Sequence, residues 1–361
     1  MPRGNMMSQA SKQPVIHAMI LGDEKVGKTT WLLQAAESGF NVLLLDGDVA
    51  GQRIAELSDE AKARVFYMDV SDDLVGEHDP KMISVVANFM TATRFLWNDT
   101  KQREYSRRDE HDEETGACVD EVWEIQPAKL DHNWVLGIDS WTTLAYSAML
   151  DKALDLGVDI ASIEKAEQNM YQGVGNRLTN IAVTQQKAPC NTVIIGHPDQ
   201  YEKQANPEGQ RAGSVKMKDK IIEWTKMIPK SSSRPHGYTL GKFFSDIGWI
   251  ESDKWGKRKI DFTKTSERTS GGNLNSKGDP AKDHRFEDLI RKIGGVVPDG
   301  NQGLGAGFII HEAGTFIPAT PKSSKSLGIG GKSKASDSIP QASAKPSTVK
   351  GVGGLGGLIK K

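Results

Sequence analysis

The sequence predicts an α/β protein built around a mostly parallel sheet, and three observations support this fold class. Short apolar runs alternate with longer stretches of helical periodicity. The runs are apolar along most of their length, as in strands that are covered on both faces. Several of the runs end at an acidic residue or a glycine, as expected at the carboxyl end of a strand, where the chain leaves the sheet. Hydrophobic residues make up 37% and charged residues 26% of the 361 residues, which is ordinary globular usage.

Five runs are predicted as parallel strands. The first is bounded by Pro14 and Gly22, the second stops at Asp46, and the fourth ends in Asp139. The fifth is followed by Gly196 and His197. In chain order the runs are Val15–Leu21, Asn41–Leu45, Val65–Asp69, Trp134–Ile138 and Asn191–Ile195.

Three stretches between these runs are predicted as helices. Gly39 follows the first of them at the usual C-cap place. The second has apolar residues spaced so that they can share one helix face. The helices cover Thr29–Ser38, Pro80–Trp97 and Ile160–Lys187, whereas the densely charged residues 98–115 are expected to form a solvated loop or insertion.

The pattern changes after Tyr201. Tyr238–Trp249 and Trp255–Phe262 are expected to form an antiparallel hairpin around Asp253–Gly256, and Phe286–Ile293 a short helix. The predicted organisation is therefore a flexible N-terminus (1–12), a core (13–200), a segment that completes the core (201–318) and a tail (319–361).

The tail differs from the rest of the chain in composition. It contains eight lysines, one acid (Asp337), many Gly and Ser residues and no aromatic residue. Such a segment buries too little apolar surface to offset the entropy of ordering, so we expect it to be disordered. Its charge would add non-specific attraction to DNA, or only solubility.

Composition excludes several classes of protein. No apolar run approaches the length of a membrane-spanning helix, and residues 1–14 lack the apolar stretch of a secretory signal. Two cysteines, Cys118 and Cys190, cannot build a disulfide framework or a cysteine-type zinc site. We therefore expect a cytoplasmic protein that makes no use of a membrane. The net charge of −1 argues neither for nor against a polyanionic partner.

The strongest motif follows the first predicted strand and opens the first helix. It has two glycines, four intervening positions, then Lys28 and Thr29, the Walker A pattern. In this pattern backbone N–H groups and the helix N-terminus surround phosphates, the lysine reaches the β- and γ-phosphates, and the threonine binds Mg²⁺. A glycine-rich surface turn beside a lysine is the alternative. The expected nucleotide-binding residues are Gly22, Asp23, Glu24, Lys25, Val26, Gly27, Lys28, Thr29 and Thr30.

Carboxylates at two other strand ends fit the same chemistry. Asp139 ends an apolar strand in the Walker B form and would hold Mg²⁺ together with Thr29; its alternative role is to cap the next helix. Asp48, in Asp46-Gly47-Asp48, would orient the attacking water, with Asp46 structural. A simple Asp-Gly turn is the alternative.

His197 follows the fifth strand. At this position its side chain could hydrogen-bond the γ-phosphate and move the following loop upon hydrolysis. An incidental histidine is the alternative. No other histidines have the spacing of metal ligands.

These residues resemble the RecA-type recombinase ATPases, and most closely the short RecA-like ATPases of bacteriophages that act in recombination and single-strand annealing. The resemblance rests on Gly22–Thr30, Asp46–Asp48, Val135–Ser140, Val193–His197 and the helical stretch Asn169–Ala182. It implies a RecA-like P-loop core, ATP and Mg²⁺ as cofactors, a homo-oligomer with ATP near a subunit interface, and single-stranded DNA as partner. It departs from the family at Asp48, where such ATPases usually carry Glu. Phage recombination or replication proteins are further possible partners.

Two basic stretches bear on the DNA partner. Tyr201–Arg234 is rich in lysine and could form a mobile DNA-contacting loop, or a solvated helix over Lys216–Lys226. Lys254–Lys259 could stack a base, reach a neighbour's γ-phosphate, or only protect an edge strand. The candidates for a cation that acts across subunits are Lys257, Arg258, Lys259 and Arg268.

The leading hypothesis is thus a Mg²⁺-dependent ATPase that assembles on single-stranded DNA, with Lys28, Asp48, Asp139 and His197 in catalytic roles. Two alternatives stay open. One is a P-loop kinase for a nucleotide or polynucleotide end. The other is a nucleotide-gated assembly factor, similar to a helicase loader, with marginal hydrolysis.

Overall fold

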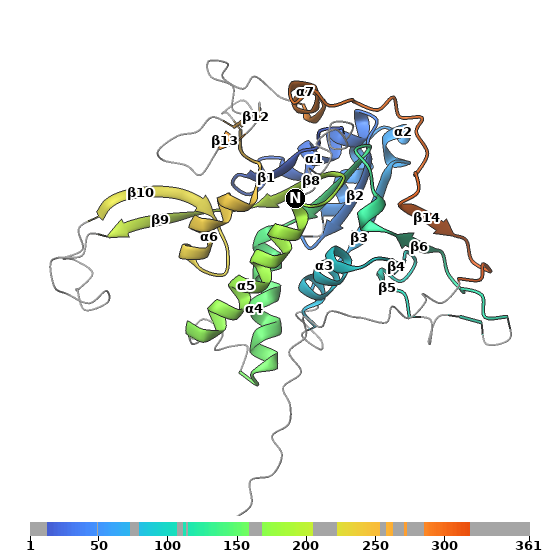
Figure 1. Cartoon of the computed structure of the whole chain (residues 1–361), viewed down its shortest axis with the longest axis horizontal. Coiled ribbons are helices and arrows are strands. Elements are labelled where there is room, and N and C mark those ends of the chain that lie inside the picture. The colour runs from blue at the N-terminus through green and yellow to red at the C-terminus, as the bar shows by residue number, and fades with distance from the viewer. Residues whose placement is uncertain are drawn as a thin grey trace, which may run out of the picture. The chain divides into compact units, whose positions relative to one another are not determined.

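A computed structural model of the chain contains a central, mostly parallel sheet (Figure 1). Its strand order is β12-β11-β1-β8-β7-β2-β3, and β13 also pairs with β11. All neighbours are parallel except β12 and β13, which run antiparallel to β11. The bounds are β1 His17–Leu21, β2 Asn41–Asp46, β3 Val65–Asp69, β7 Trp134–Asp139, β8 Asn191–Gly196, β11 Asp246–Ser252, β12 Arg258–Asp261 and β13 Gly271–Gly272.

The predicted class, an α/β protein with a mostly parallel sheet and a C-terminal antiparallel hairpin, is confirmed. The structure describes residues 13–48, 50–72, 79–106, 111–112, 115–158, 168–204, 222–252, 258–262, 271–272 and 285–317. All of these belong to one unit that runs to Pro318. The expected N-terminus (1–12) and tail (319–361) lie outside the described residues.

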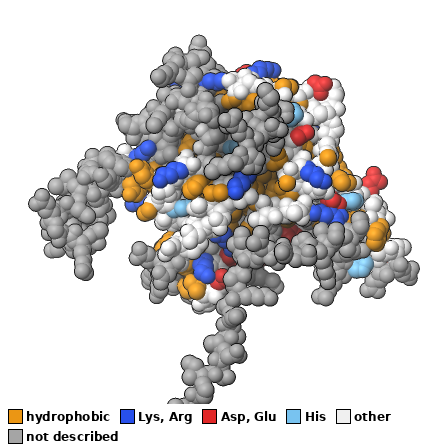
Figure 2. Space-filling model, in the orientation of Figure 1, with side chains coloured by type: hydrophobic (Ala, Val, Ile, Leu, Met, Phe, Trp, Pro, Cys, Tyr) orange, Lys and Arg blue, Asp and Glu red, His pale blue; other side chains and the backbone are white. Residues whose placement is uncertain are grey.

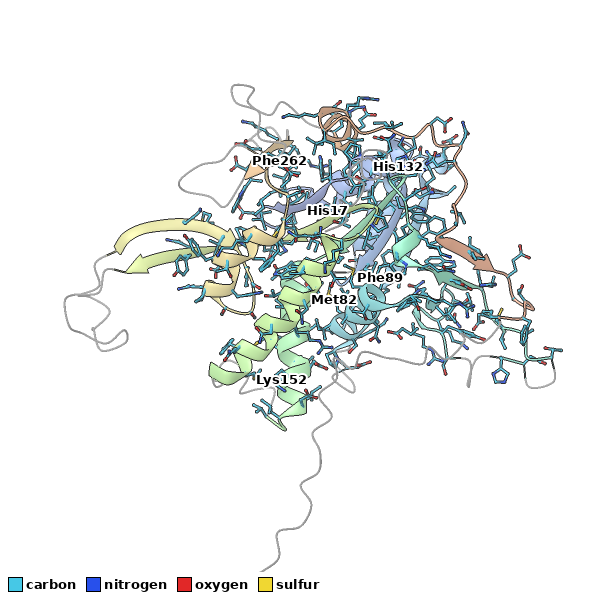
Figure 3. The ribbon with its side chains drawn as sticks, viewed as in Figure 1. His17, Met82, Phe89, His132, Lys152 and Phe262 are labelled. Atoms are coloured by element: carbon cyan, nitrogen blue, oxygen red, sulfur yellow. The ribbon has the colours of Figure 1, made fainter. Side chains whose placement is uncertain are left out.

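Helices cover both faces of the sheet because successive side chains of a strand point to opposite faces. Met19 and Leu21 of β1 belong to one apolar cluster and Ala18 and Ile20 to another. The first cluster includes side chains of α3 (Lys81–Thr91), α4 (Trp141–Asp155) and α5 (Gln168–Gln185), and the second includes side chains of α1 (Lys28–Glu37) and α7 (Phe286–Lys292). Figure 3 labels Met82 and Phe89 of the first cluster and Phe262 of the second.

A second sheet, which is antiparallel, packs beside β3. Its order is β14-β6-β4-β5, and it meets the main sheet where Phe66 contacts Trp123 and Phe308, with ring centroids 5.6 and 4.4 Å apart. Its strands are β4 Phe95–Asn98, β5 Arg103–Glu104, β6 Val122–Ile125 and β14 Phe308–His311. The predicted helix through Trp97 is therefore wrong at its end. Helix α3 ends at Thr91, Ala92 is extended, and aromatic residues that favour strands follow.

A hairpin of β9 (Pro198–Gln204) and β10 (Ile222–Pro229) projects after β8, and α6 (Arg234–Leu240) packs against it. The alternative of a helix reaching Lys226 is wrong, because Ile222–Lys226 pairs with β9. Tyr238, expected in a strand, lies in α6, whose cap is Ser233 with Pro235 in the first turn. The short helical segments are α2 Asp59–Lys62 and the 3-10 turns Ala50–Glu56, Pro127–Lys129 and Gly241–Phe243.

In the described part of the chain, no helix combines the length and the apolar character needed to cross a bilayer. Most of the acidic stretch 107–114 also lies outside the described residues.

Candidate active site

The loop between β1 and α1 has the backbone of a phosphate-binding turn. Gly27 has φ 93° and ψ 29°, and Lys25 has φ 60°, so the chain curls just before the helix begins at Lys28. Gly27 is the N-cap of α1 and provides no side-chain cap. The first N–H groups of a helix have no partner within the helix, and they favour an anion. Val26 packs against the second apolar cluster and anchors the loop.

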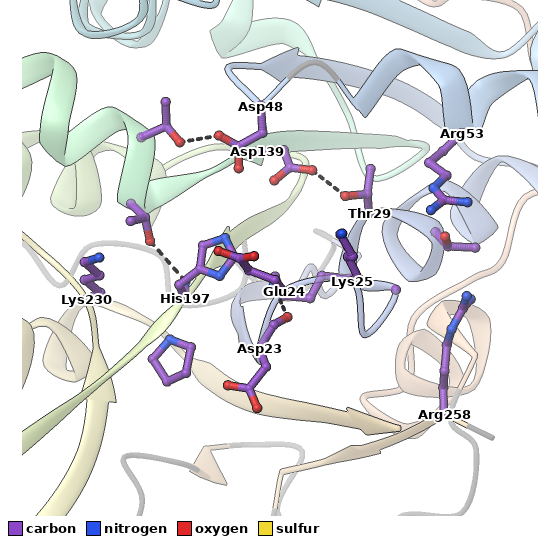
Figure 4. Close-up of a pocket in the computed structure, with 16 residues that line it drawn as sticks. Asp23, Glu24, Lys25, Thr29, Asp48, Arg53, Asp139, His197, Lys230 and Arg258 are labelled. Carbon is purple, nitrogen blue, oxygen red and sulfur yellow. Dashed lines mark hydrogen bonds between the residues drawn. The ribbon is translucent and has the colours of Figure 1, made fainter. Parts of the chain in front are cut away.

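A cavity of about 770 Å³ opens over this loop (Figure 4). The loop, the ends of β2, β7 and β8, the start of α4, and residues from more distant parts of the chain line it together. The lining residues are Asp23, Glu24, Lys25, Gly27, Lys28, Thr29, Thr30, Asp48, Arg53, Asp139, Thr142, Thr143, His197, Pro198, Lys230 and Arg258. All the predicted catalytic residues are therefore brought together, and of the predicted nucleotide-binding residues only Gly22 and Val26 do not line the cavity.

Lys28 is held across the base of the loop. Its Nζ donates hydrogen bonds to the carbonyl oxygens of Gly22 (2.9 Å) and Asp23 (2.7 Å). Burial lowers the pKa of Lys28, and the nearby carboxylates of Asp139 and Asp48 oppose this effect. Gly22 is packed so tightly that a Cβ atom there would lie 2.5 Å from the carbonyl oxygen of Ile250.

Asp139 lies against the loop from the end of β7. Its Oδ2 accepts a hydrogen bond of 2.5 Å from the Thr29 hydroxyl. Burial raises the pKa of Asp139 to about 7; Thr29 and Lys28 lower it, while Asp48 and Asp46 add to the increase. The peptide bond from Asp139 to Ser140 is cis. The alternative of Asp139 as a helix cap is wrong, because Ser140 caps α4 by accepting a hydrogen bond from the Thr143 amide.

Asp48 follows β2, the strand beside β7. Its amide donates a hydrogen bond of 2.9 Å to Oδ1 of the buried Asp46, which gives Asp46 the structural part expected for it. The exposed carboxylate of Asp48 accepts a hydrogen bond from the Thr143 hydroxyl. Thr143 thus fixes this carboxylate at the rim of the cavity.

His197 is the single residue between β8 and β9. Its amide donates to the hydroxyl of Thr142 (3.1 Å), and its carbonyl accepts from the amide of Lys230 (2.8 Å). Burial, helped by the charge of Lys28, lowers the pKa of His197, so the ring is neutral at neutral pH. Since β8 lies between β1 and β7, His197 lies between the phosphate loop and Asp139.

The chemistry of the donors fits Mg²⁺. The Thr29 hydroxyl and the Asp139 carboxylate are hard oxygen ligands that already contact one another. The described residues contain no group of three or more His, Cys, Asp or Glu able to hold a metal ion. Mg²⁺ is often bound by only one or two protein groups together with phosphate oxygens and water, which matches a site of this kind.

Several lining residues were not predicted from the sequence. Thr142 and Thr143 come directly after the acid-terminated strand, so their positions could have indicated them. Arg53 and Lys230 carry no comparable signal, since Arg53 lies in a 3-10 turn and Lys230 follows a strand that was not expected. Of the candidates for a cation acting across subunits, Arg258 lines the cavity, and Lys259 is described but does not. Lys257 and Arg268 lie outside the described residues.

No protein-family model matches this chain, and no curated protein matches its sequence. A comparison with solved structures finds the crystal structure of the RadB recombinase, with 13% sequence identity, 69% of this chain and 81% of that chain covered, and a TM-score of 0.30. A TM-score of this size assigns neither a fold nor an activity.

Proposed function

We propose that this protein is a Mg²⁺-dependent ATPase of the RecA type that binds single-stranded DNA. The observation that carries the proposal is that one cavity gathers the phosphate loop with Lys28, the contact between Thr29 and Asp139, and the side chains of Asp48 and His197. These are the parts needed to bind a triphosphate and to activate water against its terminal phosphate.

Each side chain has a distinct part in the proposed reaction. Loop amides and Lys28 stabilise phosphate charge, and Asp48 accepts the hydrogen bond of the water that attacks in line. His197, which follows β8 and is neutral, donates a hydrogen bond to the γ-phosphate. When hydrolysis removes this phosphate, the hydrogen bond is lost and the β9–β10 hairpin, which begins at the next residue, can move. Thr29 and Asp139 would hold Mg²⁺, which neutralises phosphate charge when bound.

Residues of the β9–β10 hairpin and α6 support a nucleic-acid partner. The rings of Tyr201 and Tyr238 stack with centroids 5.0 Å apart, and the Lys226 Nζ lies 5.9 Å from the centroid of Tyr238. Tyr238 is 41% exposed. Exposed aromatic rings beside cations are typical of surfaces that bind single strands without sequence preference. Figure 2 shows Lys and Arg side chains interspersed with hydrophobic ones on one face of the described residues.

The resemblance of the motifs to phage RecA-like ATPases extends the proposal. It suggests a homo-oligomer in the cytoplasm of a cell or of a phage host, with a role in DNA recombination, annealing or repair. The described residues support the ATP site and the DNA surface only, so this wider role rests on the motifs.

The direct test is ATP hydrolysis at low salt, with and without single-stranded DNA. We expect DNA to stimulate release of inorganic phosphate. Lys28→Ala should abolish nucleotide binding, whereas Asp48→Ala should leave binding intact and lower turnover about 10²-fold or more. A folded protein that binds ATP but is not stimulated by DNA would contradict the DNA part. A phosphorylated acceptor in place of inorganic phosphate would identify a kinase.

One observation favours a second candidate, the nucleotide-gated assembly factor. The carboxylate of Asp48 accepts a hydrogen bond from Thr143, and it is one methylene shorter than Glu. A carboxylate engaged in this way could position water poorly. Under this alternative Asp48→Ala changes turnover little, and Lys28→Ala still abolishes partner binding. Thr143→Val separates the two candidates. Turnover should rise if the hydrogen bond from Thr143 keeps Asp48 from positioning water, as in the assembly factor, and should not rise if Asp48 already positions water, as in the ATPase.

A further inference from the structure

Arg258 is the first residue of β12, and the sheet positions it over the phosphate loop. β11 runs parallel to β1, with Trp249 opposite Leu21, so both strands end on the side of the cavity. β12 returns antiparallel to β11, with Arg258 opposite Ser252. The first residue of β12, Arg258, therefore lies beside the loop that follows β1.

The guanidinium of Arg258 lies directly against Gly27. A Cβ atom at Gly27 would lie 2.3 Å from the Arg258 Nε and 2.5 Å from its Cζ. The positive φ favours glycine at this position, and a larger residue would also displace the Arg258 side chain. Arg258 also lines the cavity together with Lys28 and Thr29 (Figure 4).

Four other cations line the cavity, and two of them, Lys28 and Arg53, already have partners; the other two are Lys25 and Lys230. Lys28 donates to two loop carbonyls, and Arg53 forms an ion pair of 2.7 Å with Glu56. Among the described residues, no carboxylate forms an ion pair with Arg258. A guanidinium presents two parallel N–H donors, which match phosphate oxygens better than an ammonium does.

We propose that Arg258 binds the triphosphate within its own chain, as a cation that completes the phosphate loop in cis. This inference rests on the proposed nucleotide site. It differs from the expectation that a cation of this hairpin reaches across a subunit interface, because the loop that Arg258 contacts is the loop of the same chain. Arg258 binds nucleotide in this assignment and does not activate water.

The first test measures affinity for the fluorescent analogue mant-ATP with Mg²⁺, using the full chain. Arg258→Ala should raise the Kd about 10- to 100-fold, as expected for a lost charge-assisted hydrogen bond. Arg258→Lys should recover part of this loss, because the charge returns without the two-pronged geometry. In hydrolysis assays KM should rise far more than kcat falls. Arg291→Ala, an exposed arginine on α7, is the matched control and should change neither value.

The second test separates action in cis from action across subunits. Arg258→Ala protein is mixed with an excess of Lys28→Ala protein, which binds no nucleotide but carries an intact Arg258. If Arg258 acts within its own chain, the affinity of the Arg258→Ala protein for mant-ATP stays low after mixing. Restored affinity would overturn the proposal and assign Arg258 to a neighbour's site. An unchanged Kd for Arg258→Ala, with tight binding by the unaltered protein, would also overturn it. Failure of the unaltered protein to bind mant-ATP would refute the nucleotide site itself.

Discussion

The Thr29 hydroxyl donates a hydrogen bond of 2.5 Å to Oδ2 of Asp139, although the two residues follow strands that are not neighbours. Thr29 comes after β1 and Asp139 ends β7, with β8 between them. The contact thus joins two strand ends across a third. It brings together, at the phosphate loop, the two oxygen atoms that would hold Mg²⁺ in the proposed site.

Thr29→Ala should weaken nucleotide binding only when Mg²⁺ is present. The change removes one oxygen ligand and leaves the loop amides and Lys28 in place. We expect mant-ATP affinity in Mg²⁺ to fall at least about 10-fold, with affinity in EDTA nearly unchanged. Thr29→Ser, which keeps the hydroxyl, is the control. Equal losses in Mg²⁺ and in EDTA would show that Thr29 acts through the fold of the loop.

Asp139→Asn should abolish hydrolysis and yet stabilise the protein above neutral pH. The pKa of Asp139 is raised by burial to about 7, so the folded state keeps its proton where the unfolded chain has lost it. This carboxyl therefore lowers stability as pH rises from about 4 to 7, and the cost stays constant above pH 7. The variant should gain roughly 1–3 kcal/mol in urea unfolding at pH 8 and little near pH 4. A variant less stable than the unaltered protein at pH 8 would contradict this account.

His17 should make the protein sensitive to acid. Burial within β1 lowers the pKa of His17 to about 4, and its Nδ1 lies 2.9 Å from the Thr192 hydroxyl. The unfolded histidine protonates near pH 6.5, so its contribution to stability is complete above that pH and is lost as pH falls to about 4. His17→Asn, whose amide can replace Nδ1, should lose roughly 2–3 kcal/mol less than the unaltered protein between pH 7 and 4. Parallel stability curves for the two proteins would exclude this role.

The site was largely predictable because its residues follow strand ends in short motifs. The spacing within one short segment is enough to identify Gly27, Lys28 and Thr29 as a phosphate loop. Asp139 can be identified as the last residue of an apolar strand. In a parallel sheet the carboxyl ends of strands share one edge, so the order of motifs implies their convergence. Asp48 and His197 could be chosen for the same reason.

Residues whose position depends on long-range pairing could not be predicted in this way. Arg258 reaches the cavity because β12 pairs with β11 and β11 pairs with β1. The sequence predicts the hairpin, but it does not predict that the hairpin lies beside the first strand, so the position of Arg258 next to the phosphate loop could not be inferred. Lys230 reaches the cavity because β10 returns to His197, and the sequence of β10 favours a loop or a helix over a strand. The strand Phe95–Asn98 was missed because its residues also continue the apolar spacing of α3.

Tyr238 and Lys226 should carry separable parts of single-stranded DNA binding. The Tyr238 ring stacks on Tyr201, the Lys226 ammonium lies over it, and 41% of Tyr238 is exposed, so the exposed part of the ring can contact a base while the lysine neutralises a phosphate. Tyr238→Ala should weaken binding of an oligothymidylate about 10-fold or more at constant salt, and Tyr238→Phe should retain it. Lys226→Ala should instead reduce the slope of log affinity against log salt by about 0.7, the value for one phosphate contact on a single strand. Lys152→Ala, which removes a lysine from α4 paired with Asp155, is the matched control. Unchanged affinity in Tyr238→Ala, together with an unchanged salt slope in Lys226→Ala, would remove the hairpin from the DNA surface and leave the nucleotide site intact.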